Sequence, residues 1–157
     1  MGQPNLTQLN PIAATCACFH LRKASRAVTQ LFAESMKSTG LQGTQFTILV
    51  AVAISGSSRI SDLAEGLAMD RTTLTRALKP LVKRGLVVVE PSKDRRIKVV
   101  SLTPQGYTVM SQAIPFWQEA QARVVENLGE EKWNILLMLL ETLSEKTNIS
   151  SKRCIYT

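Results

Sequence analysis

The pattern of apolar residues near the start of the chain predicts a long amphipathic helix. Apolar side chains recur there every three or four positions, at Leu21, Ala24, Val28, Leu31 and Phe32. We expect this helix to run from about residue 11 to residue 38, because Gly40 and Gly43 follow and interrupt the helical pattern.

The next part of the chain predicts a pair of shorter elements. Residues 44–55 are almost entirely apolar after Gln45, and their neighbours favour a helix buried on most sides, although the β-branched content would also suit a strand. An extended piece around residues 58–60 comes next. Ser61 is then a favoured N-cap for a helix over residues 62–69.

A further helix is predicted over residues 71–84. Asp70 is suited to the N-cap, and Gly85 is suited to the left-handed conformation that often follows a helix C-terminus. Pro80 lies inside this helix and should bend it, because proline removes one backbone hydrogen bond.

A β-hairpin and two more helices complete the pattern. Residues 86–90 and 97–102 are β-rich runs on either side of a polar, basic loop, which indicates a hairpin with an exposed tip. The helical period then returns, with apolar residues at Tyr107, Met110, Ile114, Trp117, Val124 and Leu128. Gly129 interrupts it before a last helix, whose stripe consists of Trp133, Leu136, Leu137, Leu140 and Leu143.

The apolar stripes at the two chain ends favour self-association. A chain of 157 residues has little else to cover them, and exposed apolar patches of that size are rare on monomers. The order of helix, turn, helix and basic-tipped hairpin is that of a winged helix-turn-helix. We therefore expect a mainly α (α+β) fold, a winged helix-turn-helix with terminal helices that form a dimerisation region. The expected parts are residues 11–40 and 104–147 for dimerisation, 44–103 for the winged unit, and 148–157 as a flexible tail.

The net charge of +7 is confined to one segment. Between Arg71 and Lys98 there are nine basic and two acidic residues, so this segment alone accounts for the whole excess. The other ten basic and ten acidic residues cancel. A localised excess is typical of a surface that binds a polyanion, whereas a merely solvated face usually carries mixed signs.

The helix over residues 71–84 has side chains suited to a DNA major groove. Arginine can bind both acceptors of guanine, and threonine can donate to bases or phosphates and touch the thymine methyl group. The expected DNA contacts in this helix are Arg71, Thr72, Thr73, Thr75, Arg76 and Lys79. We expect Lys79 and Lys83, further along, to meet the phosphate backbone.

The hairpin tip has side chains suited to an adjacent minor groove. Lys93, Arg95 and Arg96 are expected to bind there, because narrow minor grooves concentrate negative potential. Asp94 facing DNA would repel it. We therefore expect Asp94 to pair with Arg95 or Arg96 and to hold the shape of the loop.

These segments resemble the multiple-antibiotic-resistance-regulator (MarR) family over roughly residues 15–144. The resemblance lies in residues 63–76, in residues 81–87, and in Asp94-x-Arg96 followed by Leu-Thr-x-x-Gly at residues 102–106. It implies a homodimer whose two winged domains bind a pseudo-palindromic operator. It also implies a regulator, usually a repressor, that releases DNA when a small ligand binds or a cysteine is oxidised. Pro80 departs from the family pattern.

Cys16, Cys18 and His20 form a cluster with three possible roles. Cys16 and His20 could share a helix face, whereas Cys18 would point elsewhere. The cysteines could be small buried hydrophobes, oxidant-responsive thiols or ligands of a soft metal, and all three readings stay open. Cys154 lies in the polar tail, where we expect it to be exposed.

Other function classes find less support. A single histidine excludes a metalloprotease pair, no Gly-rich phosphate loop or nucleophile elbow is present, and we predict neither an enzyme nor a bound cofactor. An architectural or non-specific nucleic-acid-binding protein is the main alternative, and a protein–protein adaptor is another. The basic segment contains no aromatic residue for stacking single strands. We predict a cytoplasmic protein with reduced thiols, because neither a signal peptide nor a membrane span is recognisable.

Overall fold

The computed structural model describes residues 5–147, which are mainly helical and include a small antiparallel sheet. The elements are α1 (Leu6–Thr15), α2 (Ala17–Ser35), η1 (Lys37–Thr39), α3 (Gly43–Ser55), β1 (Ser57–Arg59), α4 (Ile60–Gly66), α5 (Arg71–Lys83), β2 (Val87–Pro91), β3 (Lys98–Leu102), α6 (Pro104–Leu128) and α7 (Glu130–Thr147). Within this part of the chain, no helix is long and apolar enough to cross a membrane.

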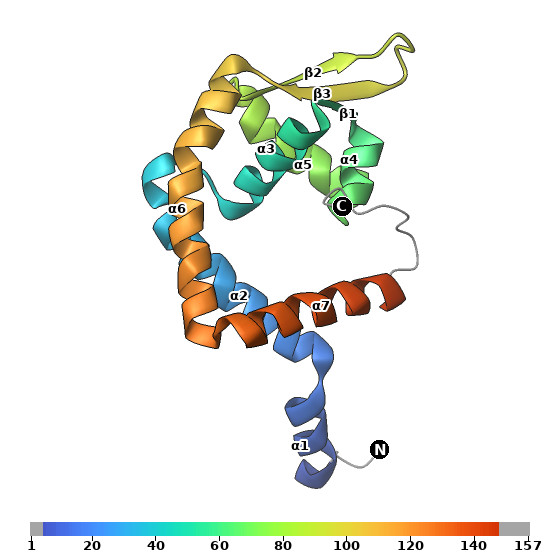
Figure 1. Cartoon of the computed structure of the whole chain (residues 1–157). Coiled ribbons are helices and arrows are strands. Elements are labelled where there is room, and N and C mark those ends of the chain that lie inside the picture. Colours follow the sequence, from blue (N-terminus) through green and yellow to red (C-terminus); the bar gives the residue numbers. More distant parts are fainter. Residues whose placement is uncertain (1–4, 148–157) are drawn as a thin grey trace.

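Residues 43–102, which we call the winged unit (Figure 1), supply most of the buried core, and Met36, Leu41 and Ala113 from outside the unit complete it. The sheet order is β1-β3-β2, so β3 is the central strand, and Val100 lies opposite Ser58 on one side and Val89 on the other. Helices α3, α4 and α5 pack on the sheet and on one another. The fully buried side chains at their centre include Ile48, Leu49, Leu63, Leu74, Leu81 and Val100.

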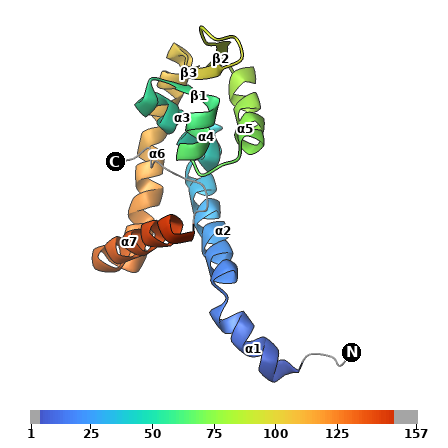
Figure 2. The same cartoon turned by 90° about the vertical axis from the view of Figure 1, so that its right-hand side faces the viewer.

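The helices outside this unit, α1, α2, α6 and α7, are called the terminal helices below. Figures 1 and 2 show α2 and α6 running side by side away from the winged unit, with α7 crossing beyond them and α1 projecting outward. Phe32 of α2 and Trp117 of α6 meet with ring centroids 6.5 Å apart. No residue of α2 is buried, whereas α6 buries Gly106, Ala113 and Ala120.

The predicted helix over residues 11–38 is wrong, because the structure has two helices there. Cys16 adopts an extended backbone conformation (φ −66°, ψ 107°) between α1 and α2. The amphipathic period on which the prediction rested begins only at Leu21. Helix α1 begins with a separate capping box. In this box the side chain of Asn5 accepts from the backbone N–H of Gln8, and the side chain of Gln8 accepts from the backbone N–H of Asn5.

The predicted N-cap at Ser61 is also wrong. Helix α4 begins at Ile60, with Arg59 as its N-cap, and the Ser61 hydroxyl donates to the Asp62 carboxylate at 3.0 Å. Ile60 is buried, so the start of the helix follows the residue that packs in the core. The predicted helices at residues 44–55 and 71–84, the hairpin and the break at Gly129 are confirmed to within one or two residues.

Candidate nucleic-acid interface

Helix α5 is positioned by its cap and by one apolar face. The Asp70 carboxylate accepts hydrogen bonds from the backbone N–H of Thr73 (2.9 Å) and from its hydroxyl (2.5 Å). These bonds lower the pKa of the Asp70 carboxyl below its ordinary value of 3.8, and the bond from the Thr73 hydroxyl has the largest effect. Leu74, Leu78 and Leu81 are buried, so the remaining faces of the helix point outward.

The N-terminal half of α5 presents polar and basic side chains to solvent. A shallow hollow of about 470 Å³ lies along it, lined by Arg71, Thr72, Thr75, Arg76 and Lys79. The hydroxyl of Thr75 donates to the carbonyl of Arg71 at 2.6 Å, and that of Thr73 donates to Asp70. Both threonines can therefore still accept hydrogen bonds and offer their methyl groups, but their hydroxyl hydrogens are already used.

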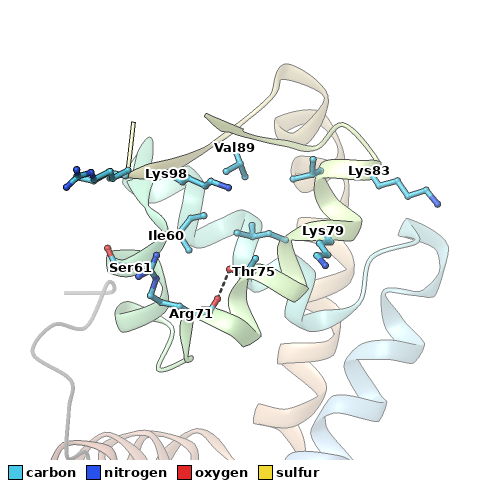
Figure 3. A pocket seen from close by; sticks show the side chains of 12 residues that line it. Ile60, Ser61, Arg71, Thr75, Lys79, Lys83, Val89 and Lys98 are labelled. Atoms are coloured by element: carbon cyan, nitrogen blue, oxygen red, sulfur yellow. Dashed lines mark hydrogen bonds between the residues drawn. The ribbon is translucent and has the colours of Figure 1, made fainter. Parts of the chain in front are cut away.

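A deeper groove of about 650 Å³ separates α5 from the hairpin. Figure 3 shows Arg71, Lys79, Lys83 and Lys98 around it, with Ile60 and Val89 also lining it. The groove thus combines an apolar floor with a basic rim. The full set of basic residues that line it is Arg71, Lys79, Lys83, Arg96 and Lys98.

The hairpin loop has a defined backbone conformation. The N–H of Ser92 donates to the carbonyl of Ile97 (2.8 Å), and the N–H of Ile97 donates to the carbonyl of Asp94 (2.9 Å). The Asp94 carboxylate accepts from the backbone N–H of Arg96 at 3.0 Å. Asp94 therefore shapes the loop through a backbone amide and not through the predicted guanidinium pairing, because the Arg96 amide lies only two residues away.

Cys16, Cys18 and His20 lie at the junction of α1 and α2. Cys16 is half-buried at the helix break and Cys18 is exposed, so the reading of both as buried hydrophobes is wrong for the single chain. A ring nitrogen of His20, Nε2, lies 2.9 Å from the carbonyl oxygen of Ala14. Among residues 5–147 no group of three or more His, Cys, Asp or Glu could hold a metal ion, and Cys154 lies outside this range.

Comparisons with known proteins agree on one family. A family model described as MarR family matches residues 39–97. The transcriptional regulator FarR of Neisseria gonorrhoeae is 30% identical over 126 residues, which cover 80% of this chain and 86% of that protein. The chain belongs to the MarR family of transcriptional regulators. Another relative, the transcriptional repressor NicR of Pseudomonas putida, is 28% identical over 82% of each chain.

The MarR family fold is also found among solved structures. The crystal structure of the M. tuberculosis transcriptional regulator MOSR in complex with DNA matches with a TM-score of 0.78 and 32% identity. The match covers 84% of this chain and 96% of that one. The predicted winged helix-turn-helix is thereby confirmed. MarR proteins are DNA-binding regulators and not enzymes, as the sequence predicted.

The structure brings part of the predicted site together. Arg71, Thr75, Lys79 and Arg96 line one groove although α5 and the hairpin are separate elements. Lys93 and Arg95 are exposed in the loop but line neither hollow, and Thr73 is engaged by the helix cap. The groove is also lined by residues that were not predicted as DNA contacts: Ile60, Ser61, Leu78, Val82, Val89, Ile97 and Lys98.

Proposed function

We propose that this MarR-family protein binds a pseudo-palindromic DNA operator as a homodimer and represses transcription. In this proposal α5 enters the major groove, with base contacts from Arg71, Thr72, Thr75 and Arg76, while Lys79 meets phosphates. The observation that carries the proposal is the hollow on the exposed face of α5. All five residues that line it are predicted DNA contacts. The hairpin would place Lys93, Arg95 and Arg96 in the adjacent minor groove.

The dimer in this proposal is built by residues 11–40 and 104–147, and residues 44–103 bind DNA. Its support is the exposure of large apolar side chains on the terminal helices, such as Ile12 (62% exposed), Met138 (57%) and Leu139 (55%). The M. tuberculosis relative was crystallised in complex with DNA, and NicR is named a repressor, which supports operator binding and repression. The predicted cytoplasmic location stays a prediction.

Two arginine variants test the DNA contacts. We expect Arg76→Ala to reduce discrimination at one base position by about 1–3 kcal/mol, and Arg96→Ala to weaken binding to all duplexes. Arg123→Ala, which removes an exposed arginine of α6 outside the winged unit, is the matched control once light scattering shows that it remains dimeric. Fluorescence anisotropy with an operator selected from genomic fragments gives the affinities. Equal operator binding by the wild type and both variants would refute the assignment.

Release of the operator by thiol modification is the second part of the proposal. Cys18 is exposed and Cys16 is half-buried at the break between two helices, so both lie where oxidation could alter the path of the terminal helices. We expect peroxide to release the wild-type protein from its operator. Unchanged release by peroxide in the variant with both cysteines changed to serine would exclude Cys16 and Cys18 as the responding thiols.

A further inference from the structure

The turn that follows α5, residues 84–86, is hydrogen-bonded to two other segments. One segment follows α2 and the other leads into α6. Helix α5 ends at Lys83, Arg84 is its C-cap, and Gly85 turns the chain with φ +67°. The next residue, Leu86, is buried at the start of the hairpin. The orientation of the helix therefore depends on what holds this turn.

One attachment joins the turn to the end of α2. The Arg84 Nη1 group donates to the carbonyl of Gly40 at 2.7 Å, a contact between residues 44 positions apart. Gly40 ends η1 in the left-handed conformation (φ +65°). On either side of this short helix, Met36 and Leu41 are buried. The acceptor of the Arg84 hydrogen bond therefore sits in a segment fixed by the core.

A second attachment joins the turn to the start of α6. The Thr103 hydroxyl donates to the carbonyl of Gly85 at 2.6 Å. The Thr103 backbone N–H donates to the carbonyl of Leu86 at 3.1 Å. The same hydroxyl oxygen accepts from the N–H of Gly106 at 3.0 Å and so caps α6. A Cβ atom added at Gly106 would lie only 2.0 Å from the carbonyl oxygen of Leu86. The backbone of Gly106 therefore lies close to the backbone of Leu86.

We propose that this turn couples the terminal helices to the orientation of α5, with Arg84 as the positioning residue. Since α2 and α6 run together into the terminal region, a change in their packing would be transmitted to the C-terminal end of α5 at both attachments. The inference rests on the proposed homodimer on a pseudo-palindromic operator. In such a dimer the coupling fixes the distance and rotation between the two recognition helices. It thereby fixes the half-site spacing that the protein selects.

The test compares affinities for operators of different spacing. One added base pair rotates a half-site by roughly 35° and moves it by about 3.4 Å, so we expect the wild type to lose on the order of tenfold in affinity. Arg84→Met keeps the apolar stem but removes the donor, and we expect its loss to shrink to about threefold. Arg84→Lys retains a donor and should restore most of the selectivity.

Lys83→Met is the control for lost charge. It removes a positive charge from the preceding residue, so it should weaken binding to every duplex alike and leave the spacing ratio as in the wild type. A role of Arg84 in folding alone would lower the unfolding midpoint in urea without changing the ratio. Thr103→Val removes the hydroxyl bond to Gly85 on the α6 side, and it should also flatten the spacing preference.

The possible outcomes separate the two proposals. If the wild type selects one spacing sharply and both Arg84→Met and Thr103→Val keep that selectivity, the coupling is refuted while the operator-binding function stands. If the wild type binds no duplex in preference to another, the proposed function itself is refuted. Flattened selectivity in both variants, with the ratio intact in Lys83→Met, would support the coupling.

Discussion

The winged unit and the terminal helices differ in where their apolar side chains go. In the winged unit they face inward, and residues such as Leu49, Leu63 and Leu74 are fully buried. Along α7, by contrast, Ile135, Met138 and Leu139 are each about half exposed. Burial of apolar surface is the dominant favourable term in folding, so one region is stabilised within its own chain and the other requires a second surface. The buried side chains of the winged unit thus stabilise the fold, whereas the exposed side chains of α7 are available for association with a second chain.

The largest expected effect follows from removing the second surface. The double variant Ile135→Glu and Leu139→Lys replaces two exposed apolar residues one helical turn apart with a pair that itself favours helix. We expect monomers in light scattering and a loss of operator affinity of about 100-fold or more, because the two half-sites are no longer bound together.

Asn134→Gln, at an exposed polar position of the same helix, is the control and should remain dimeric. The unfolding temperature of the wild type should also rise with protein concentration, as expected for a linked assembly. A dimeric double variant would show that α7 is not part of the association surface, and the contrast between the two regions would then need another explanation.

An intermediate effect is expected at the boundary between the regions. In Gly106→Ala the new Cβ atom would meet the Leu86 carbonyl oxygen at 2.0 Å and the Leu102 side chain at 2.8 Å. Because backbone must shift to make room, we expect the free energy of unfolding in urea to fall by about 2–3 kcal/mol. Gly43→Ala has nothing within 4 Å of the added atom, and it should leave that free energy nearly unchanged. Equal stability of the two variants would contradict the close packing.

The smallest effect is expected at the cap of α5 and depends on pH. Since hydrogen bonds lower the pKa of Asp70 in the folded state, its ionised form stabilises the protein above the ordinary value of 3.8. This contribution is lost as the pH falls through the folded-state pKa. Asp70→Asn still offers an acceptor but does not titrate. Its urea midpoint should therefore fall below that of the wild type near pH 6, and the difference should shrink towards pH 3. A difference independent of pH would exclude the carboxylate charge as its cause.

The sequence predicted the elements whose signals are local. Asp70, the buried leucines of α5 and Gly85 each act within a few residues, so both ends of that helix could be located. The groove between α5 and the hairpin could not be predicted in the same way. Its floor joins Ile60, Val82 and Val89 from three elements, and only the way the hairpin folds back over α5 brings them together.

The break at Cys16 and the role of Asp94 show two other limits. A helical period counted from Leu21 onward holds no information on residues before it, so α1 was merged with α2. The acidic residue in the basic loop, Asp94, accepts a hydrogen bond from a backbone amide of the loop. Its predicted partner was wrong, because side-chain charge suggested a guanidinium whereas the nearest donor is the Arg96 amide.

The uncovered surface of α7 has a consequence for gene dosage. By mass action, when two chains must associate before they occupy an operator, the amount of the active species at low abundance rises with the square of the number of chains in the cell. Halving expression would then leave about a quarter of the dimeric, DNA-binding species. The exposed leucines of one helix would thus make the transcriptional output of the target genes a steep function of copy number.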